Sequence, residues 1–396
     1  MTLCEIYETI LDISLGYEKA SLQEIKNLYV LANSYYEKEF GKKCNLKTEK
    51  AKLFYWIQEK SRYELLTDCM SDMIYDMLYY DPKKHGNDCK DLTFFLNHFE
   101  LFQSLIKDFE EEFREPEEEG IPYEEEIPIT RITKKQFFEY MEELLLEVDP
   151  SKEYLKLFYQ ALKEKKIIFW KDLNKKEKNY YKKLLGFQEE TPILEKASEE
   201  DLEEYVVINL FETTEDVTNL MHEFAHYISA LDGKKDLLPL LTEYPSIFYE
   251  FYAIFYLGRK GYSDDEVNYL LNIRIQDTLV QIESMYPYLR YLSIFLENGQ
   301  ITEELDKKTP FLYGTPDYHH LCDSCTEGIL ESNPLQSFLY FIGTYLSVRE
   351  IKKFQNGEEI LPRIKKQTEN LDDVSLEKLF KKEIRKNKIK VKKKLA

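Results

Sequence analysis

Residues 205–229 read YVVINLFETTEDVTNLMHEFAHYIS, and this stretch decides the expected fold around the functional site. Its first four residues, YVVI, form a β-branched run that is long enough for one strand, which ends at Asn209. A helix then begins near Thr213 or Thr214, whose hydroxyls can cap free amide groups. The stretch therefore predicts a short strand that leads directly into a helix. Apolar residues flank the polar centre of that helix: Val217, Leu220, Met221, Phe224 and Ile228.

The centre of the predicted helix carries the motif HEFAH, in which His222 and His226 are four residues apart. Positions four apart lie one above the other on a helix, so both imidazoles point to the same side. A catalytic zinc ion takes three protein ligands and keeps one position open for water. Glu223 follows the first histidine and is placed to accept a proton from a zinc-bound water. The motif predicts one zinc ion per chain, with Glu223 as the base.

The third zinc ligand has to come from outside the motif. Asp232 and Asp236 lie close behind it, near a glycine where the chain turns, and no third histidine stands at the short spacing of a metzincin. Glu243 lies 21 residues past His222, far enough for a loop and an antiparallel helix to return to the metal. We therefore expect Glu243 to be the third ligand.

A second glutamate, Glu250, follows seven residues after Glu243 and falls on nearly the same helical face. This spacing suits a carboxylate that accepts a hydrogen bond from a ligand histidine and orients it. The sequence alone leaves open whether Glu250 is instead a solvated surface acid.

The rest of the chain indicates a mainly α protein. Glycine and proline number only 13 each in 396 residues, which favours long helices over an all-β chain with many tight turns. The stretch EPEEEGIPYEEEIPIT combines three prolines, a glycine and runs of like charge, as linkers do. We expect an N-terminal helical lobe (1–115), an acidic proline-containing linker (116–130), a catalytic region (131–380) and a basic tail (381–396). Helical apolar stripes are predicted at Leu65, Cys69, Met73 and Met77, and at Phe137, Met141, Leu144 and Leu145.

Charge and composition restrict the partners. The formal net charge of -20 would repel a phosphate backbone, so we expect no nucleic-acid partner. The first twenty residues carry acids where a signal peptide is basic, and no apolar run approaches membrane-spanning length, so we expect a cytoplasmic protein that does not enter a membrane. Six scattered cysteines favour reduced thiols. Free thiols in a loop are favoured over a second metal site at His319, Cys322 and Cys325.

Two blocks of the chain resemble the thimet oligopeptidase and oligoendopeptidase F group of gluzincin peptidases. VVINLFETTEDVTNLMHEFAHYIS is similar to the strand and zinc helix of that family, although the family usually has glycine where Ala225 stands. TEYPSIFYE is similar to its third-ligand block, which supports Glu243 and Glu250. Weaker similarity extends the resemblance to roughly residues 131–355, and only the two metal blocks are specific.

The resemblance implies a large, mostly helical ellipsoid with a substrate channel, a small β element beside the zinc helix, and a short unfolded peptide as substrate. The family also stabilises the oxyanion with a histidine and tyrosines near its C-terminal helix. Here Ile329, Gln336 and Phe338 stand where such groups are often found, and His319 and His320 lie upstream as alternatives. An ungapped match of residues 334–343 keeps Tyr340 in register for this role, while a slipped register offers Tyr345.

The expected activity is that of a zinc-dependent endopeptidase of the oligopeptidase type. The strand just before the zinc helix is expected to hold the substrate backbone by β-addition at Val207 and Asn209. The alternative is a peptide-binding or scaffold protein that keeps the zinc site and has lost oxyanion stabilisation. Retention of Glu223 favours the enzyme, because a structural zinc site needs no base. The oligomeric state is not fixed by the sequence.

Overall fold

The structure, a computed structural model, describes residues 1–15, 19–79, 97–114, 129–185, 193–196, 204–230, 243–309, 334–369 and 376–383. The protein is mainly α, as predicted, with one small β-sheet. Internal contacts divide the chain into two compact units, residues 1–77 with 286–333 and residues 78–285 with 334–396. This division differs from the expected lobes, because each unit is built from two separate stretches of chain. Most of the expected linker and basic tail lie outside the described residues.

The first unit is helical in its described part. Its core gathers apolar side chains from the N-terminal helices, among them Ile6, Ala32 and Ile57. Leu65 of the predicted apolar stripe is buried, whereas the side chains of the other three members fall outside the described set. Cys4 and Cys44 are buried free thiols. The helices of this unit are α1 (Leu3–Leu15), α2 (Leu22–Phe40), most of α3 (Lys50–Tyr79), the end of α12 (Asp264–Asn298) and α13 (Glu303–Lys308).

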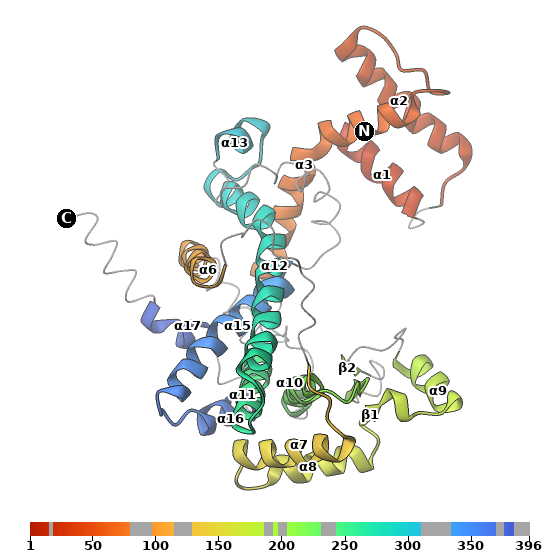
Figure 1. Cartoon of the computed structure of the whole chain (residues 1–396). Helices are drawn as coiled ribbons and strands as arrows, with labels where there is room; N and C mark the ends of the chain where they lie inside the picture. Colours follow the sequence, from red (N-terminus) through yellow and green to blue (C-terminus); the bar gives the residue numbers. More distant parts are fainter. Residues whose placement is uncertain are drawn as a thin grey trace, which may run out of the picture. The chain divides into compact units, whose positions relative to one another are not determined.

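The second unit contains all candidate site residues that the structure describes, together with the sheet (Figure 1). Its helices are α6 (Phe99–Phe113), α7 (Lys134–Val148), α8 (Glu153–Lys163), the 3-10 turn η1 (Trp170–Asp172), α9 (Lys175–Leu185), α10 (Thr214–Ala230), α11 (Glu243–Arg259), most of α12, α15 (Pro334–Gln355), α16 (Leu361–Glu369) and α17 (Leu376–Leu379). Its strands are β1 (Ile167–Phe169), β2 (Ile193–Lys196) and β3 (Glu204–Ile208).

The predicted strand at residues 205–208 is β3, the central strand of a three-stranded sheet with the order β1-β3-β2. It pairs in parallel with β1 and antiparallel with β2. Helix α10 follows β3 and packs against β3 and β2. The sheet therefore fixes the direction in which the chain enters the helix that carries the HEFAH motif.

Helix α10 begins at Thr214, close to the predicted start, but the polar contacts there differ from the expected hydroxyl caps. The carboxylate of Asp216 accepts hydrogen bonds from the backbone N–H groups of Phe211 and Thr213, as an acid in the first turn can do. The Thr214 hydroxyl instead donates to Glu266 of α12, at 2.6 Å. Hydrogen bonds thus connect the start of α10 both to its own first turn and to α12.

Helix α11 is almost entirely buried, and it packs against both α10 and α15 (Figure 1). Gly343 lets α15 approach closely, because a Cβ at this position would lie 2.8 Å from Ile247 Cδ1 and 3.2 Å from Glu243 Cβ. The Ser347 hydroxyl of α15 donates to the carbonyl of Tyr244, at 3.0 Å. A helix buried on all sides brings its two glutamates, Glu243 and Glu250, into the interior.

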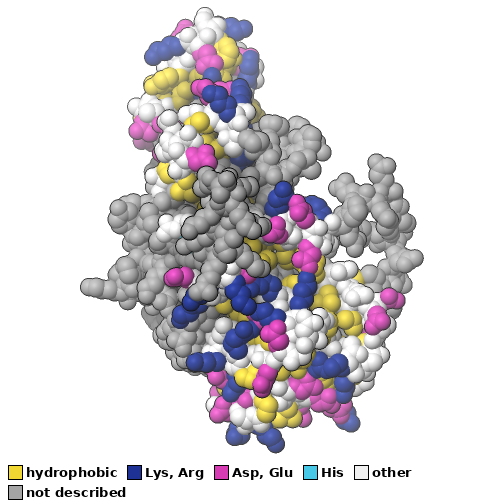
Figure 2. All heavy atoms as spheres, turned by 90° about the vertical axis from the view of Figure 1, so that its left-hand side faces the viewer, with side chains coloured by type: hydrophobic (Ala, Val, Ile, Leu, Met, Phe, Trp, Pro, Cys, Tyr) yellow, Lys and Arg dark blue, Asp and Glu magenta, His cyan; other side chains and the backbone are white. Residues whose placement is uncertain are grey.

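The surface of the molecule mixes charges of both signs. Figure 2 shows one face on which Lys and Arg side chains are interspersed with Asp and Glu side chains. Several such groups form ion pairs within the second unit, for example Lys352 with Glu112 and Arg363 with Glu350. The net negative charge is therefore not gathered into a uniform acidic surface on this face. No helix in the described part of the chain combines the length and apolar character needed to cross a membrane.

Candidate metal centre

Helix α10 presents the two histidines of the motif on one side, as their spacing predicts. Their Nε2 atoms lie 3.1 Å apart. His222 is buried, with 7% of its surface exposed, and His226 is partly buried. The apolar residues around them, Leu220, Met221 and Phe224, are buried as well. Burial of the helix thus holds the two imidazoles in place.

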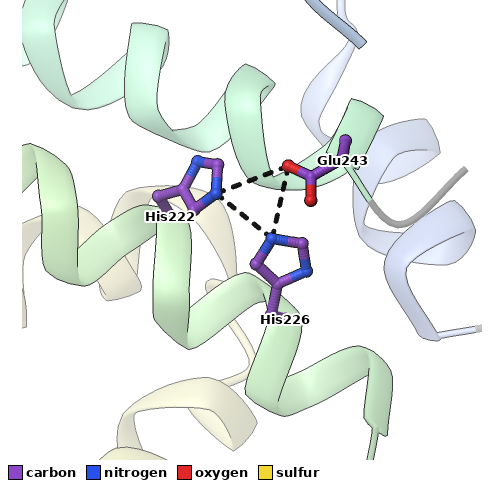
Figure 3. A group of neighbouring side chains, drawn as sticks. All are labelled: His222, His226 and Glu243. Atoms are coloured by element: carbon purple, nitrogen blue, oxygen red, sulfur yellow. Dashed lines mark hydrogen bonds and ion pairs between the residues drawn. The ribbon is translucent and has the colours of Figure 1, made fainter. Parts of the chain in front are cut away.

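Helix α11 brings Glu243 to the same point. Its Oε2 atom lies 3.6 Å from His222 Nε2 and 3.5 Å from His226 Nε2. Figure 3 shows the carboxylate and the two imidazoles pointing toward one another from two different helices. Within the described ranges, these three residues form the one group of histidine, cysteine and acidic side chains whose ligand atoms converge closely enough to hold a metal ion.

The separations among the three ligand atoms fit zinc. Bonds of about 2.0–2.2 Å at tetrahedral angles place the ligand atoms of a zinc site roughly 3.3–3.5 Å apart. The observed separations are 3.1, 3.5 and 3.6 Å, so a point equidistant from the three atoms in their plane lies about 2.0 Å from each. Three protein ligands of this kind leave a fourth coordination position for water or substrate.

The hydrogen bonding of the three residues also favours a cation. Glu250 Oε2 lies 3.0 Å from His222 Nδ1, so the carboxylate accepts the Nδ1–H proton and the lone pair of this imidazole is left on Nε2. Glu243 Oε2 is buried and has no hydrogen-bond partner among the residues that the structure describes. The three ligand atoms therefore offer lone pairs to one point, where too few hydrogen-bond donors are present. A cation bound between them would satisfy all three.

The same contacts shift the pKa values of two of these groups, His222 and Glu243. Burial by itself lowers the pKa of His222, but the hydrogen bond and charge of Glu250, with the charges of Glu223 and Glu243, outweigh burial and raise it. Burial raises the pKa of Glu243, but the interactions of its carboxylate with His226, His222 and Arg274 outweigh burial and lower it. The site therefore favours an ionised Glu243.

The structure decides between the two interpretations of Glu250. Its side chain is only 4% exposed and contacts His222, so it is not a solvated surface acid. Arg274 of α12 contacts the other oxygen of the same carboxylate: its Nε and Nη2 atoms lie 2.8 and 2.6 Å from Glu250 Oε1. The sequence analysis did not single out Arg274. Its signal was a lone cation between Ile273 and Ile275, in residues 267–276, which are otherwise apolar or neutral.

The structure relates the two predicted catalytic residues to this group in different ways. Glu223 adjoins His222 on α10, is half-buried, and its charge acts on that imidazole. Tyr340 of α15 is half-buried and within electrostatic reach of Arg274. Tyr345, which the slipped register offered, packs instead on Phe341 and Phe380. Of the two tyrosines, Tyr340 is the one that interacts electrostatically with Arg274, the partner of Glu250.

The expected β-addition of substrate to β3 is a prediction that the structure corrects. Val207 is paired on both sides, with Ile168 of β1 and Ile193 of β2. Asn209, which follows the strand, is 3% exposed. A central strand has no free row of backbone groups, so a peptide cannot add to β3 at Val207, and Asn209 is not available at a surface.

Several other candidates lie outside the described residues. They are the alternative third ligands Asp232 and Asp236, and the cluster of His319, Cys322 and Cys325. Comparison of the chain with known protein families, with curated proteins and with solved structures finds no match.

Proposed function

We propose that this protein is a zinc-dependent endopeptidase that hydrolyses short unfolded peptides in the cytoplasm and holds one zinc ion per chain. The observation that carries the proposal is the convergence of His222, His226 and Glu243 on one point, with Glu223 next to the first histidine. A structural zinc site closes all four positions with protein ligands and has no use for an adjacent base. Three ligands beside a free carboxylate are the arrangement that hydrolysis requires.

A zinc ion bound to these residues supplies a Lewis acid that polarises the scissile carbonyl and acidifies water. Glu223 accepts a proton from the attacking water on its carboxylate as the new C–O bond forms. It then delivers that proton to the leaving amine nitrogen as the peptide C–N bond breaks, so that one glutamate serves as base and then as acid. Glu223 follows a ligand by one residue, about 100° around the helix, so it stands beside the metal ligands and is not one of them.

The remaining residues orient this machinery. Glu250 holds the Nδ1–H of His222, which keeps the lone pair on Nε2 directed at the metal position. Tyr340 is our candidate for donating a hydrogen bond to the oxyanion, where the loss of one donor typically costs about 100- to 1,000-fold in rate. Its proximity to Arg274 supports this assignment.

The test is hydrolysis of a quenched fluorescent peptide library, with the metal content of the same samples measured in parallel. We expect one zinc per chain, loss of turnover on chelation, and its recovery with one equivalent of zinc. Glu223→Gln keeps the shape of the side chain but removes the proton acceptor, so turnover should fall roughly 100- to 10,000-fold at unchanged zinc content. Glu142→Gln on α7 changes a half-buried glutamate whose carboxylate accepts a hydrogen bond from Tyr159 of α8; it is the matched control and should stay within about threefold.

Two outcomes would count against the proposal. Full hydrolysis by a metallated Glu223→Gln protein would exclude this glutamate as the base. A metallated wild-type protein that binds peptides without cleaving them would favour a peptide-binding or scaffold protein.

A further inference from the structure

Arg274 and Glu250 form a buried pair in which each carboxylate oxygen has its own partner. The guanidinium donates through Nε to Oε1, which also lies 2.6 Å from Nη2 as an ion pair, while Oε2 accepts from His222 Nδ1. Because the guanidinium holds one carboxylate oxygen and the imidazole holds the other, the two partners together fix the plane of the carboxylate. Arg274 of α12 therefore determines the orientation of the His222 ring through Glu250 of α11.

Burial makes Glu250 dependent on this arginine. The carboxylate is 4% exposed, so water cannot orient it or compensate its charge. If the guanidinium were removed, the only other partner that the described contacts give Glu250 is His222. The imidazole would then follow the carboxylate, and the direction of its Nε2 lone pair would change.

Arg274 has further contacts at its backbone and at its guanidinium. The Thr278 hydroxyl lies 2.9 Å from the carbonyl oxygen of Arg274 and 2.9 Å from the Thr344 hydroxyl of α15. At the other end of the side chain, Nη1 lies 3.9 Å from Asp277, one turn further along α12. Both threonines are buried. The backbone at Arg274 is thus linked to α15 through Thr278, while its guanidinium contacts Glu250 and Asp277.

We propose that Arg274 is a positioning residue of the candidate metal centre, which acts through Glu250 to orient His222 and so sets the affinity of the site for zinc. This inference rests on the proposed metal centre, but it does not require the protein to be a peptidase. Removal of an outer partner of a ligand histidine typically costs 10- to 100-fold in metal affinity.

The experiment measures zinc affinity of the full chain by competition with a chromophoric chelator, and records the visible spectrum of the Co²⁺ form. We expect Arg274→Gln to weaken zinc binding about 10- to 100-fold and to change the Co²⁺ bands. Arg274→Lys keeps the positive charge but has a single nitrogen, so its zinc affinity should lie between those of the wild type and Arg274→Gln. Arg259→Gln removes another arginine–glutamate pair of the second unit, that with Glu147, and should change the affinity less than about twofold.

A double-mutant cycle separates positioning from general damage to the fold. If Arg274 acts through Glu250, Arg274→Gln should add little to the loss of affinity that Glu250→Gln already causes. Additive losses, or wild-type affinity and spectrum in a folded Arg274→Gln protein, would overturn the inference. So would a wild-type protein that binds no zinc. If the wild type binds zinc but cleaves no peptide, and Arg274→Gln still weakens zinc binding, only the proposed activity fails.

Discussion

Helix α10 meets one buried glutamate of another helix at its start and a second one in its central turns, and the hydrogen bonding of the two glutamates differs. At the start of the helix, Glu266 accepts three hydrogen bonds, from the Thr130 amide, the Thr130 hydroxyl and the Thr214 hydroxyl. At the central turns, Glu243 Oε2 lies between two imidazoles at 3.5 and 3.6 Å and has no hydrogen-bond donor in the described part of the protein. Glu266 is 2% exposed and Glu243 is 9% exposed.

This difference separates a structural carboxylate from one that needs a ligand. Burying an ionised group without partners is costly, and proteins normally supply donors to every buried carboxylate oxygen. Hydrogen-bond donors of the protein alone satisfy the carboxylate of Glu266. Those of Glu243 are incomplete, and they become complete when a cation binds between the carboxylate and the two histidines.

The largest expected contrast comes from the same substitution at both glutamates. Glu266→Gln replaces an oxygen that faces donors by an NH₂ group, so the free energy of unfolding should fall by about 2–3 kcal/mol, while zinc affinity is retained. Glu243→Gln should weaken zinc binding by more than the roughly 10- to 100-fold typical of an outer partner. In chelator at pH 8, its free energy of unfolding should change by less than about 1 kcal/mol, because no hydrogen bond is lost.

Urea unfolding with and without chelator, together with zinc competition, measures both effects. The proposed difference between the two glutamates is contradicted if Glu243→Gln destabilises the metal-free protein as strongly as Glu266→Gln does. Glu243 would then be a structural residue, and retention of full zinc by this variant would remove it from the ligand set.

The sequence predicted those parts of the site that depend on local spacing. His222 and His226 meet because they stand four apart on one helix, and the chain length between them and Glu243 allows a second helix to return. The strand at residues 205–208 was also predicted, because β-branched runs favour that conformation. Its central position was not predicted, because the pattern within one strand does not reveal which of its edges are paired. That is why β-addition at Val207 was expected and is wrong.

Long-range polar partners were also missed. Arg274 lies 24 residues past Glu250, and Glu266 stands after two other acids in the first turn of α12, where acids are ordinary. Neither residue has a partner at a fixed spacing in the sequence. Their roles depend on how α12 packs against α10, α11 and α15, which only the tertiary structure gives.

A second test concerns the helix that holds Glu243 in place. In Gly343→Ala the new methyl group would lie 2.8 Å from Ile247 Cδ1 and 3.2 Å from the Cβ and carbonyl carbon of Glu243. Overpacking of this kind typically costs 1–3 kcal/mol, and the shift of Glu243 away from α15 should weaken zinc binding as well. Gly258→Ala is the control, since its methyl group meets only Val267 Cγ2, at 3.4 Å. Alanine also favours the helix by about 1 kcal/mol.

Unfolding and zinc competition on the two alanine variants give the answer. We expect Gly258→Ala to be neutral or slightly more stable, with unchanged zinc affinity. If Gly343→Ala loses stability but binds zinc as tightly as the wild type, α15 supports the fold without setting the position of Glu243.

The smallest effect should come from a carboxylate of the Glu266 kind in the turn between α7 and α8. Asp149 accepts hydrogen bonds from the Ser151 hydroxyl and the Tyr154 amide, and Lys365 lies 3.2 Å away. Burial raises the pKa of this carboxyl group, but these hydrogen bonds and the ammonium charge outweigh burial and lower it. The ionised form is therefore favoured in the folded state. Its stabilisation is present above the unfolded pKa of about 3.9 and is lost as the pH falls through the lower folded value.

Asp149→Asn should consequently reduce the free energy of unfolding by about 1 kcal/mol at pH 7, with a gap to the wild type that narrows as the pH falls below about 4. Asp172→Asn removes an exposed carboxylate that pairs with Lys134, and it should change stability by less than about 0.5 kcal/mol at every pH. Urea unfolding from pH 7 down to the acid limit of the folded state measures both gaps. A gap for Asp149→Asn that stayed constant with pH would mean that hydrogen-bond geometry, and not the charge, carries its contribution. The distinction matters because a carboxylate satisfied by protein donors should respond to protons alone, whereas Glu243 should respond to zinc.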